Sequence, residues 1–401
     1  MTRLRKLFRF EQASGLLIIA AMLLGLAAAN SPLAPLYAAV HHAPIYIGVG
    51  PFVIDEPLIQ WINEGLMVFF FLLVGLEIKR ELMEGHLSTP KCATLPAFAA
   101  LGGMVVPAAI YAGLNWTDPV AIRGWAIPTA TDIVLALGVL SLLGPRVPVG
   151  LKVFLTSLAI FDDIGAVLII GLFYGDDISL VPLLLAAVAV AGLVLVNVLR
   201  VTRPAVYVVV GLVLWVAMLE AGVEAALAGI LIALAVPLHR PGSHGSSPLR
   251  ETERCLHPWG VLVIVPLFAF FNAGIAIGDD AFGSLLGPVS LGVVGGLFLG
   301  KQLGVAGAVW VAVRLGLGQL PAGVNWGQIY GVALLAGIGF TMSLLVASLA
   351  FSDAALIASA KIAILAGSFV SAVAGLGVIY LTTRKPQPAQ GQVADLRELV
   401  S

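Results

Sequence analysis

The chain has 401 residues, of which 60% are hydrophobic and only 11% are charged. Soluble globular domains carry about 25% charged residues, so this composition excludes an ordinary soluble protein and indicates an all-α polytopic membrane protein. The net charge of −1 says little by itself, and the sequence holds no basic patch for nucleic acid, no phosphate-binding loop and no metal-protease motif. We therefore expect no cofactor, no nucleic-acid partner and no enzymatic activity.

Apolar runs near 20 residues predict the membrane spans. The chain contains about twelve such runs and is predicted to form a single transporter unit, residues 1–401. The predicted spans are 12–30, 59–82, 94–114, 121–143, 151–174, 181–199, 205–219, 223–237, 258–275, 288–312, 327–350 and 356–382.

Residues 30–58 join the first two spans and contain no Lys or Arg, which places them outside the cell. Two runs of β-branched residues flank Gly48-Val49-Gly50-Pro51, a pattern typical of a β-hairpin. A plain loop would fit nearly as well. The free edges of a hairpin favour pairing with a second copy of the chain.

The distribution of Lys and Arg predicts the orientation of the chain. With a cytoplasmic amino terminus, eighteen of the 21 basic residues lie at cytoplasmic ends of spans, and the exceptions are Arg123, Lys301 and Lys361. Because this bias sets topology, both termini are predicted to be cytoplasmic. Residues 240–257 form the predicted cytoplasmic linker between the two halves, and residues 384–401 a disordered cytoplasmic tail.

Two adjacent acids, Asp162 and Asp163, lie inside the apolar run 158–170. An ionised aspartate at the centre of a membrane helix costs about 3 kcal/mol or more. Nothing in helix formation or packing requires the pair, so we interpret both residues as functional.

Two predicted spans carry residues that interrupt a helix. Pro128 removes one helical hydrogen bond in the fourth span, and Gly337 and Gly339 weaken the eleventh. Each break lies in the middle of a three-span set, residues 94–174 and 288–382. The sets are seven spans apart, an odd offset, so they cross the membrane in opposite senses. Paired interrupted spans in inverted repeats are typical of transporters with a site at mid-membrane.

A broken helix exposes amide ends of partial positive charge and carbonyl ends of partial negative charge. Asp132 lies where it could compensate the positive ends, and Lys301 where it could compensate the negative ends. Because Lys301 lies in the middle of a span, we expect it to have a carboxylate partner. The candidates are Asp162, Asp163 and Asp132.

The carboxylates, the Thr131 hydroxyl and freed carbonyls form an all-oxygen environment, which suits a hard cation such as Na⁺. A carboxylate that takes up a proton loses the charge that binds the ion, so protons and the cation exclude one another. A site that faces one side at a time would turn this exclusion into exchange. We expect Asp163 to bind the cation and Asp162 to give proton access or serve as a second ligand.

Six segments resemble those of the bacterial NhaA-type sodium/proton antiporters, and the resemblance spans nearly the whole chain. This family is itself an example of inverted-repeat transporters, so the resemblance and the repeat prediction are not independent. The segments are VGLEIKREL (74–82), AIPTATD (126–132), AIFDDIGA (159–166), LHPW (256–259), FAFFNAG (268–274) and GIGFTMS (337–343).

The resemblance implies electrogenic exchange of cytoplasmic Na⁺ or Li⁺ for external protons across a bacterial inner membrane, with a role in pH and sodium homeostasis. It implies that Asp162 and Asp163 bind the ion near Thr131, and that Asp132 and Lys301 compensate charge. It also implies a homodimer joined by the external hairpin.

In the family a cytoplasmic cluster governs activation by alkaline pH. The matching residues here are Glu77, Arg80, Glu81 and Glu253, although ordinary interfacial charge pairing would explain them equally well. Glu224 stands where the family frequently has a histidine, so pH dependence based on an imidazole there is not expected to carry over.

Three other functions are alternatives. An intramembrane aspartyl protease also uses two membrane aspartates but would need a Gly-x-Gly-Asp motif, which the sequence lacks. A cation channel is a second rival, but the sequence has no Thr-Val-Gly-Tyr-Gly filter, and a channel does not explain the paired breaks. A proton-coupled carrier for another small solute is the serious alternative. It should place amide or aromatic side chains beside the acids, and Asn197 and Asn272 are the candidate amides.

Overall fold

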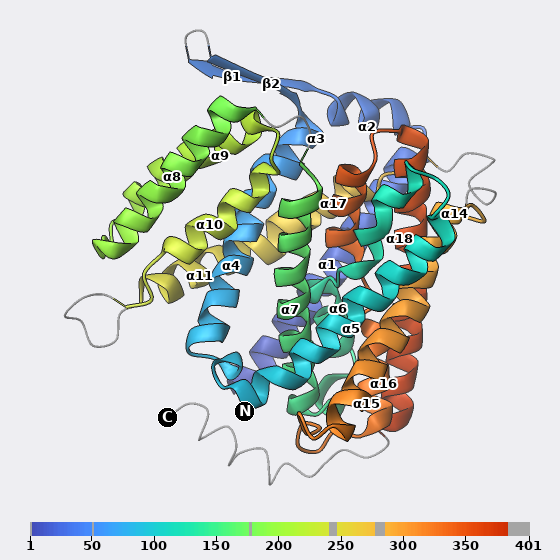
Figure 1. Ribbon diagram of the computed structural model, residues 1–401. Helices are drawn as coiled ribbons and strands as arrows, with labels where there is room; N and C mark the ends of the chain where they lie inside the picture. The colour runs from blue at the N-terminus through green and yellow to red at the C-terminus, as the bar shows by residue number, and fades with distance from the viewer. Residues whose placement is uncertain (1, 50–51, 176–178, 240–246, 277–284, 384–401) are drawn as a thin grey trace.

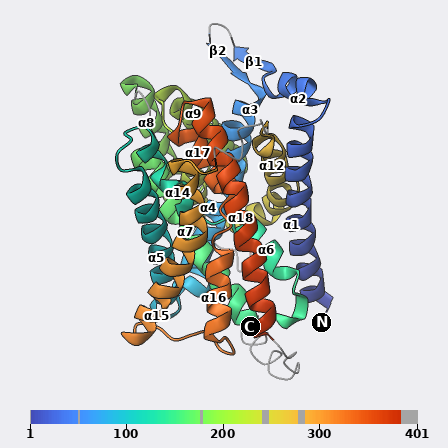
Figure 2. The same ribbon diagram turned by 90° about the vertical axis from the view of Figure 1, so that its right-hand side faces the viewer.

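The structure is a computed structural model that describes residues 2–49, 52–175, 179–239, 247–276 and 285–383. The described chain is a bundle of helices with one small β-hairpin at one end (Figures 1 and 2). The start of α1 and the end of α18 lie together at the opposite end of the bundle (Figure 2).

The first half of the chain contains a strand pair and a series of long helices. Its elements are α1 (Thr2–Ala29), α2 (Ala34–His41), β1 (Pro44–Val49), β2 (Phe52–Pro57), α3 (Leu58–Gln60), η1 (Trp61–Leu66), α4 (Met67–Met83), η2 (His86–Ser88), α5 (Pro90–Asn115), η3 (Ala121–Thr129), α6 (Ile133–Ser141), η4 (Gly144–Arg146), α7 (Val149–Phe173), α8 (Leu180–Val198), α9 (Pro204–Ala221), η5 (Ala225–Leu227) and α10 (Ala228–Ala235).

The described part of the second half contains helices and the loops that join them. Its elements are α11 (Pro248–Trp259), η6 (Gly260–Ile264), α12 (Val265–Ala273), α14 (Pro288–Gly295), η7 (Gly296–Gly300), η8 (Gln302–Ala306), α15 (Gly307–Arg314), α16 (Trp326–Leu335), α17 (Phe340–Ala350) and α18 (Ala354–Thr382). Of these, η6, η7 and η8 are π-helical turns inside longer helices, as is η1 in the first half.

Within the described residues, nine helices are long and apolar enough to cross a membrane, and two bent pairs raise the total to 11. The predicted eighth span, 223–237, holds only a short apolar helix, Ala225–Ala235. Glu224 accepts a hydrogen bond from the Ala226 amide at 3.2 Å and so caps the start of that helix. The multi-pass membrane class is confirmed, whereas the number twelve and the inverted repeats stay predictions.

The predicted β-hairpin is confirmed. Strands β1 and β2 pair in antiparallel fashion, with Ile47 opposite Ile54. Tyr46 and Ile47 are 65% and 53% exposed. The hairpin stands clear of the helix bundle (Figure 1), so its apolar surface is available to another molecule.

The predicted linker, 240–257, includes the start of a helix. Helix α11 begins at Pro248, where the fixed φ of proline suits the first turn of a helix. The Ser247 hydroxyl accepts the Arg250 amide at 3.3 Å and caps this turn. Residues 240–246 and the predicted tail, 384–401, lie outside the described residues.

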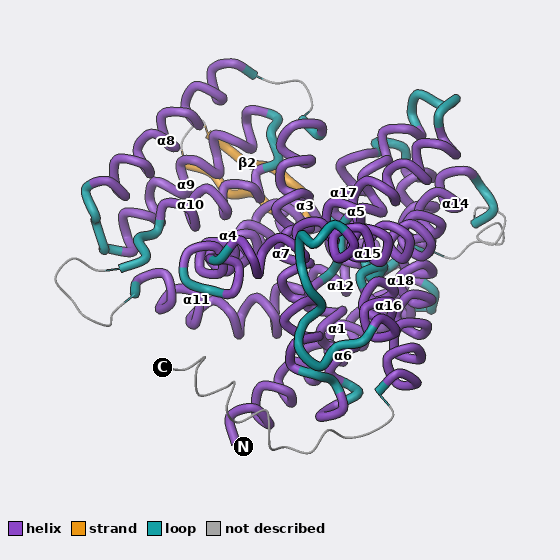
Figure 3. Tube along the Cα trace, turned by 60° about the horizontal axis from the view of Figure 1, so that its bottom comes forward, coloured by secondary structure: helices purple, strands orange, loops and turns teal. Residues whose placement is uncertain are grey.

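The helices form two groups. Helix α5 packs against η3, α7, α14 and α15, while α18 packs against α14, α16 and α17. In the view of Figure 3, α8 and α9 stand apart from this group, next to α10. The two bent pairs belong to the packed group, which therefore places both breaks near α7 and its acids.

Candidate ion-binding site

Two spans are broken inside the helix bundle. Helices η3 and α6 meet at an angle of 43°, and α16 and α17 at 42°. Pro128 lies in the last turn of η3, after which the chain is extended at Ala130. The second break contains Gly337 and Gly339 and ends where α17 begins.

The two breaks are in direct contact. The backbone amide of Asp132 donates to the carbonyl of Ile338 at 2.6 Å. The Thr131 hydroxyl lies 2.8 Å from the carbonyl oxygen of Ala336. Backbone groups that a continuous helix would have paired internally are thus paired across the crossing, which irregular backbone in a membrane requires.

Asp132 lies between two helix amino termini. Its Oδ1 accepts the Leu135 amide of α6 at 2.9 Å. Its Oδ2 accepts the amide of Thr341 in α17 at 3.1 Å and the hydroxyl of the same residue at 2.7 Å. A carboxylate between two amino termini offsets the partial positive charge of both.

Lys301 lies at the carboxyl end of η3. Its Nζ donates to the carbonyl of Thr129 at 2.6 Å, to the Thr131 hydroxyl at 2.9 Å, and to Oδ2 of Asp162 at 2.7 Å. The ammonium therefore meets a freed carbonyl of partial negative charge and one of the two adjacent acids. Of the three partners expected for Lys301, the structure has Asp162.

The Asp162–Lys301 pair is fully buried, since both side chains have 0% exposure. Oδ2 of Asp162 also lies 2.5 Å from the Thr131 hydroxyl. That hydroxyl has one hydrogen, so it donates either to Asp162 or to the Ala336 carbonyl. Oδ1 of Asp162 is buried and has no hydrogen-bond partner among the described residues, which leaves an acceptor oxygen available at the site.

Asp163 differs from its neighbour. It is 5% exposed, yet within the described part of the chain it makes no hydrogen bond or ion pair. The two acids point in different directions because consecutive helical residues are about 100° apart. One carboxylate is therefore held by a lysine, while the other makes no hydrogen bond or ion pair within the described residues.

Close helix packing brings Lys301 to this point. A Cβ on Gly300 would lie 2.7 Å from the Cα of Pro107 on α5, and one on Gly304 would collide with the Gly102 carbonyl. The backbones of the two spans are thus in contact on both sides of Lys301. The π-helical turns η7 and η8 flank this residue, and π-turns inside α-helices are frequent at functional sites.

The four residues of the predicted regulatory cluster lie together on α4 and α11. Arg80 Nε is 3.0 Å from Glu253 Oε2, and Arg80 Nη1 is 2.6 Å from Glu81 Oε1. Glu77 lies close enough to interact electrostatically with Arg80 and Glu253. The cluster is a network of charged side chains, and Arg80 pairs with two of its three acids.

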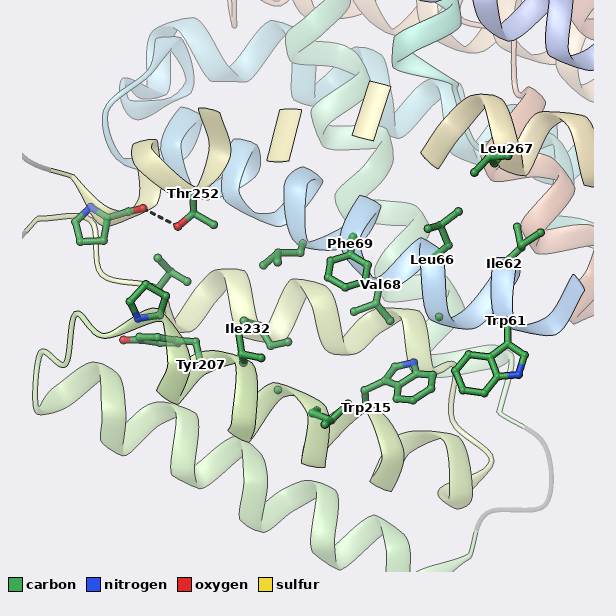
Figure 4. A pocket seen from close by; sticks show the side chains of 18 of the residues that line it. Trp61, Ile62, Leu66, Val68, Phe69, Tyr207, Trp215, Ile232, Thr252 and Leu267 are labelled. Carbon is green, nitrogen blue, oxygen red and sulfur yellow. Dashed lines mark hydrogen bonds between the residues drawn. The ribbon is translucent and has the colours of Figure 1, made fainter. Parts of the chain in front are cut away.

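A wide pocket of about 730 Å³ lies between α4, α9 and α10 (Figure 4). Its lining is apolar and aromatic, and it includes Trp61, Tyr207 and Trp215. None of the predicted site residues lines it. The acids and Lys301 lie instead in the tightly packed group, so pocket size does not identify the ion site.

Sequence reasoning missed the side chains that fix the breaks from outside. Tyr111 is completely buried, and its hydroxyl donates to the Ala121 carbonyl of η3. The Tyr174 hydroxyl donates to the Arg123 carbonyl of the same helix. The available signal was a tyrosine near the end of each of two apolar runs, 94–114 and 151–174, because a buried tyrosine hydroxyl usually needs a partner.

Known proteins of similar sequence cover almost the entire chain. The family model described as Na⁺/H⁺ antiporter 1 matches residues 5–379. The chain is 51% identical over 386 residues to the Na⁺/H⁺ antiporter NhaA of Rhodospirillum rubrum, covering 94% of this chain and 97% of that protein. It is 52% identical over 384 residues to the Na⁺/H⁺ antiporter NhaA of Pseudomonas putida, covering 95% and 98%. The chain therefore belongs to the Na⁺/H⁺ antiporter 1 family.

Proposed function

We propose that the chain exchanges cytoplasmic Na⁺ or Li⁺ for external protons, electrogenically and by alternating access. The observation that carries this proposal is the contrast between two adjacent buried acids. Asp162 is paired with Lys301, whereas Asp163 has no partner among the described residues. An unpaired carboxylate in a buried place is a binding site for a small cation or a proton.

The two acids account for the exchange. A cation at Asp163 gains a second carboxylate ligand when Asp162 leaves Lys301 and Thr131. When the cation departs, each acid can take up a proton, and a protonated acid no longer attracts the ion. Two acids that release one monovalent cation and bind two protons move net charge, which supports an electrogenic exchange with more than one proton per ion.

Alternating access is supported by the crossing of the breaks. Asp132 and Lys301 compensate the helix ends without an added ion, so the crossing can persist while the site is empty. Rocking of one group of helices against the other would then open the site to one side at a time, as in other transporters with paired broken helices.

The cellular setting follows from charge and family. We propose a bacterial inner-membrane protein with both termini cytoplasmic, because basic residues gather at one set of span ends and because the start of α1 and the end of α18 lie on one side (Figure 2). Its role would be pH and sodium homeostasis. We further propose that Glu77, Arg80, Glu81 and Glu253 adjust activity to cytoplasmic pH.

A carrier for another small solute has less support. Asn197 donates to the Ala235 carbonyl at 2.6 Å, and Asn272 donates to Asn63 at 2.8 Å. Both amides are therefore engaged elsewhere than at Asp162, whose described partners are Lys301 and Thr131.

The test is Asp163→Asn in sealed proteoliposomes, with proton flux driven by Na⁺, Li⁺ or K⁺. We expect the wild type to respond to Na⁺ and Li⁺ and the variant to lose both responses while still inserting, because the amide cannot carry the charge that binds the ion. Asp55→Asn, an exposed acid of the hairpin, is the matched control and should retain exchange. Full exchange by Asp163→Asn would refute the assignment.

A further inference from the structure

We propose that Tyr111 and Tyr174 are positioning residues of the ion site. Their hydroxyls donate hydrogen bonds to carbonyls of η3. These bonds fix the position of η3 along its axis, and thereby the distance from its last residues to Lys301 and Asp162. The inference rests on the proposed function, since it concerns the affinity of the same site for Na⁺. Neither tyrosine touches the acids, so both act through η3.

Helix η3 needs support from outside. It is a 3₁₀-helix of nine residues, Ala121–Thr129. Runs of 3₁₀-helix longer than three or four residues are uncommon because their hydrogen bonds have poor geometry. The internal hydrogen bonds of such a segment do not hold its length and its axial position firmly. Its final carbonyl, on Thr129, nevertheless accepts a hydrogen bond from Lys301.

The hydroxyls of the two tyrosines, which come from different spans, donate hydrogen bonds to carbonyls in the first turn of η3. Tyr111 lies on α5 and has 0% exposure; its hydroxyl donates to the Ala121 carbonyl at 2.8 Å. Tyr174 follows the last residue of α7, and its hydroxyl donates to the Arg123 carbonyl at 2.7 Å. These oxygens lie on the half of the broken span that ends at the site.

The contact leaves little room for movement. A Cβ on Gly124 would collide with the Tyr111 hydroxyl and would lie 2.6 Å from Cζ of Phe351. The Asp118 carboxylate accepts the amides of Val120 and Ala121 at 2.8 and 3.0 Å. These two bonds lower the pKa of Asp118, so the cap stays ionised near neutral pH. The start of η3 is thus fixed from several sides.

The tyrosines connect this fixed end to the ion site. Tyr174 adjoins α7, the helix that carries Asp162, so its hydroxyl ties η3 to the same helix that the Thr131 hydroxyl contacts at the crossing. The two helices are joined at both ends of one segment. A shift of η3 along its axis would lengthen the contacts of Thr129 and Thr131 with Lys301 and Asp162.

The experiment compares Tyr111→Phe and Tyr174→Phe with Tyr207→Phe. Tyr207 is the matched control because its hydroxyl donates to the Val201 carbonyl at 2.8 Å, in a part of the chain away from η3. Each variant is assayed for Na⁺-driven proton flux in proteoliposomes and for thermal unfolding in detergent. Na⁺-induced stabilisation gives a second measure of ion binding, independent of transport.

We expect the Na⁺ concentration for half-maximal exchange to rise about five- to tenfold in the two η3 variants, the effect of one lost hydrogen bond on binding. The maximal rate should stay within about twofold of wild type, and the fall in Tm should equal that of Tyr207→Phe. The same two variants should need more Na⁺ for thermal stabilisation.

An unchanged Na⁺ requirement in both η3 variants, or a fall in Tm and maximal rate without a change in that requirement, would overturn the proposal. If Tyr111→Phe fails to insert, Tyr174→Phe alone decides the test, because the Tyr174 hydroxyl donates to a carbonyl of the same turn. If the wild type and Tyr207→Phe both exchange Na⁺ for protons in vesicles of the same composition, the proposed function holds. An unchanged Na⁺ requirement in the η3 variants then contradicts only the positioning role of the tyrosines.

Discussion

At the residue scale, the site consists of one lysine and three acids with unequal surroundings. Lys301 and Asp162 form an ion pair without solvent contact, and Asp132 is satisfied by amides and a hydroxyl. Asp163 alone of the three acids lacks such contacts among the described residues. A buried ion pair by itself adds little stability, because desolvation offsets the attraction, but removing one partner is costly.

Lys301→Ala is therefore expected to lower the free energy of unfolding by about 3–5 kcal/mol, since Asp162 would be left as an uncompensated buried charge. Thermal unfolding in detergent measures the change. Lys361→Ala is the control, because Lys361 also lies in a membrane helix but is only partly buried. A Tm equal to that of the control would mean that Lys301 has access to water.

At the element scale, the second break depends on the absence of a side chain at Gly337. A Cβ there would collide with the Leu297 carbonyl and lie 2.5 Å from the Ser371 hydroxyl. The backbone of η7 and the side chains of α18 therefore approach the broken span as closely as glycine allows. This approach holds Lys301, four residues after Leu297, beside the crossing.

Gly337→Ala should destabilise the protein by about 1–3 kcal/mol through overpacking, and should reduce exchange because the crossing must shift. The control is Gly377→Ala on α18, where a Cβ meets nothing within 4 Å. That change should be neutral or stabilising, as expected for glycine replaced in a helix. Equal Tm values for the two variants would contradict the packing argument.

The elements that depend on local chemistry could be predicted from the sequence. Pro128 and Gly337 lie at the two breaks because a missing amide and a missing Cβ act within one turn, and the hairpin follows from its β-branched runs. Long-range choices could not be predicted. Which acid pairs with Lys301 depends on the rotation of α7 about its axis. The hydrogen bond of the Tyr111 hydroxyl depends on which backbone carbonyl of η3 packs against it.

At the scale of the whole molecule, the chain is a helix bundle with one hairpin that packs little against it. The hairpin carries exposed apolar residues such as Tyr46 and Ile47, and each strand has one unpaired edge within the described residues. Such an edge favours pairing with another strand. We propose that two copies of the chain form a homodimer through this element.

Replacing residues 44–57 by a short Gly/Ser linker should convert the dimer to a monomer, because the strand edges would be gone. Native mass spectrometry and cross-linking in membranes measure the change. Exchange by the monomer should persist, since the crossing of the breaks lies within one chain. A dimer that survives the replacement would show that other surfaces hold the copies together.

One carboxylate serves the amino termini of both α6 and α17, with one oxygen assigned to each. If either half-helix moved away alone, one carboxylate oxygen of the buried Asp132 would lose its backbone amide donor. Asp132 thus joins the two spans, so in the proposed exchange we expect them to move as one unit while the other helices move around them.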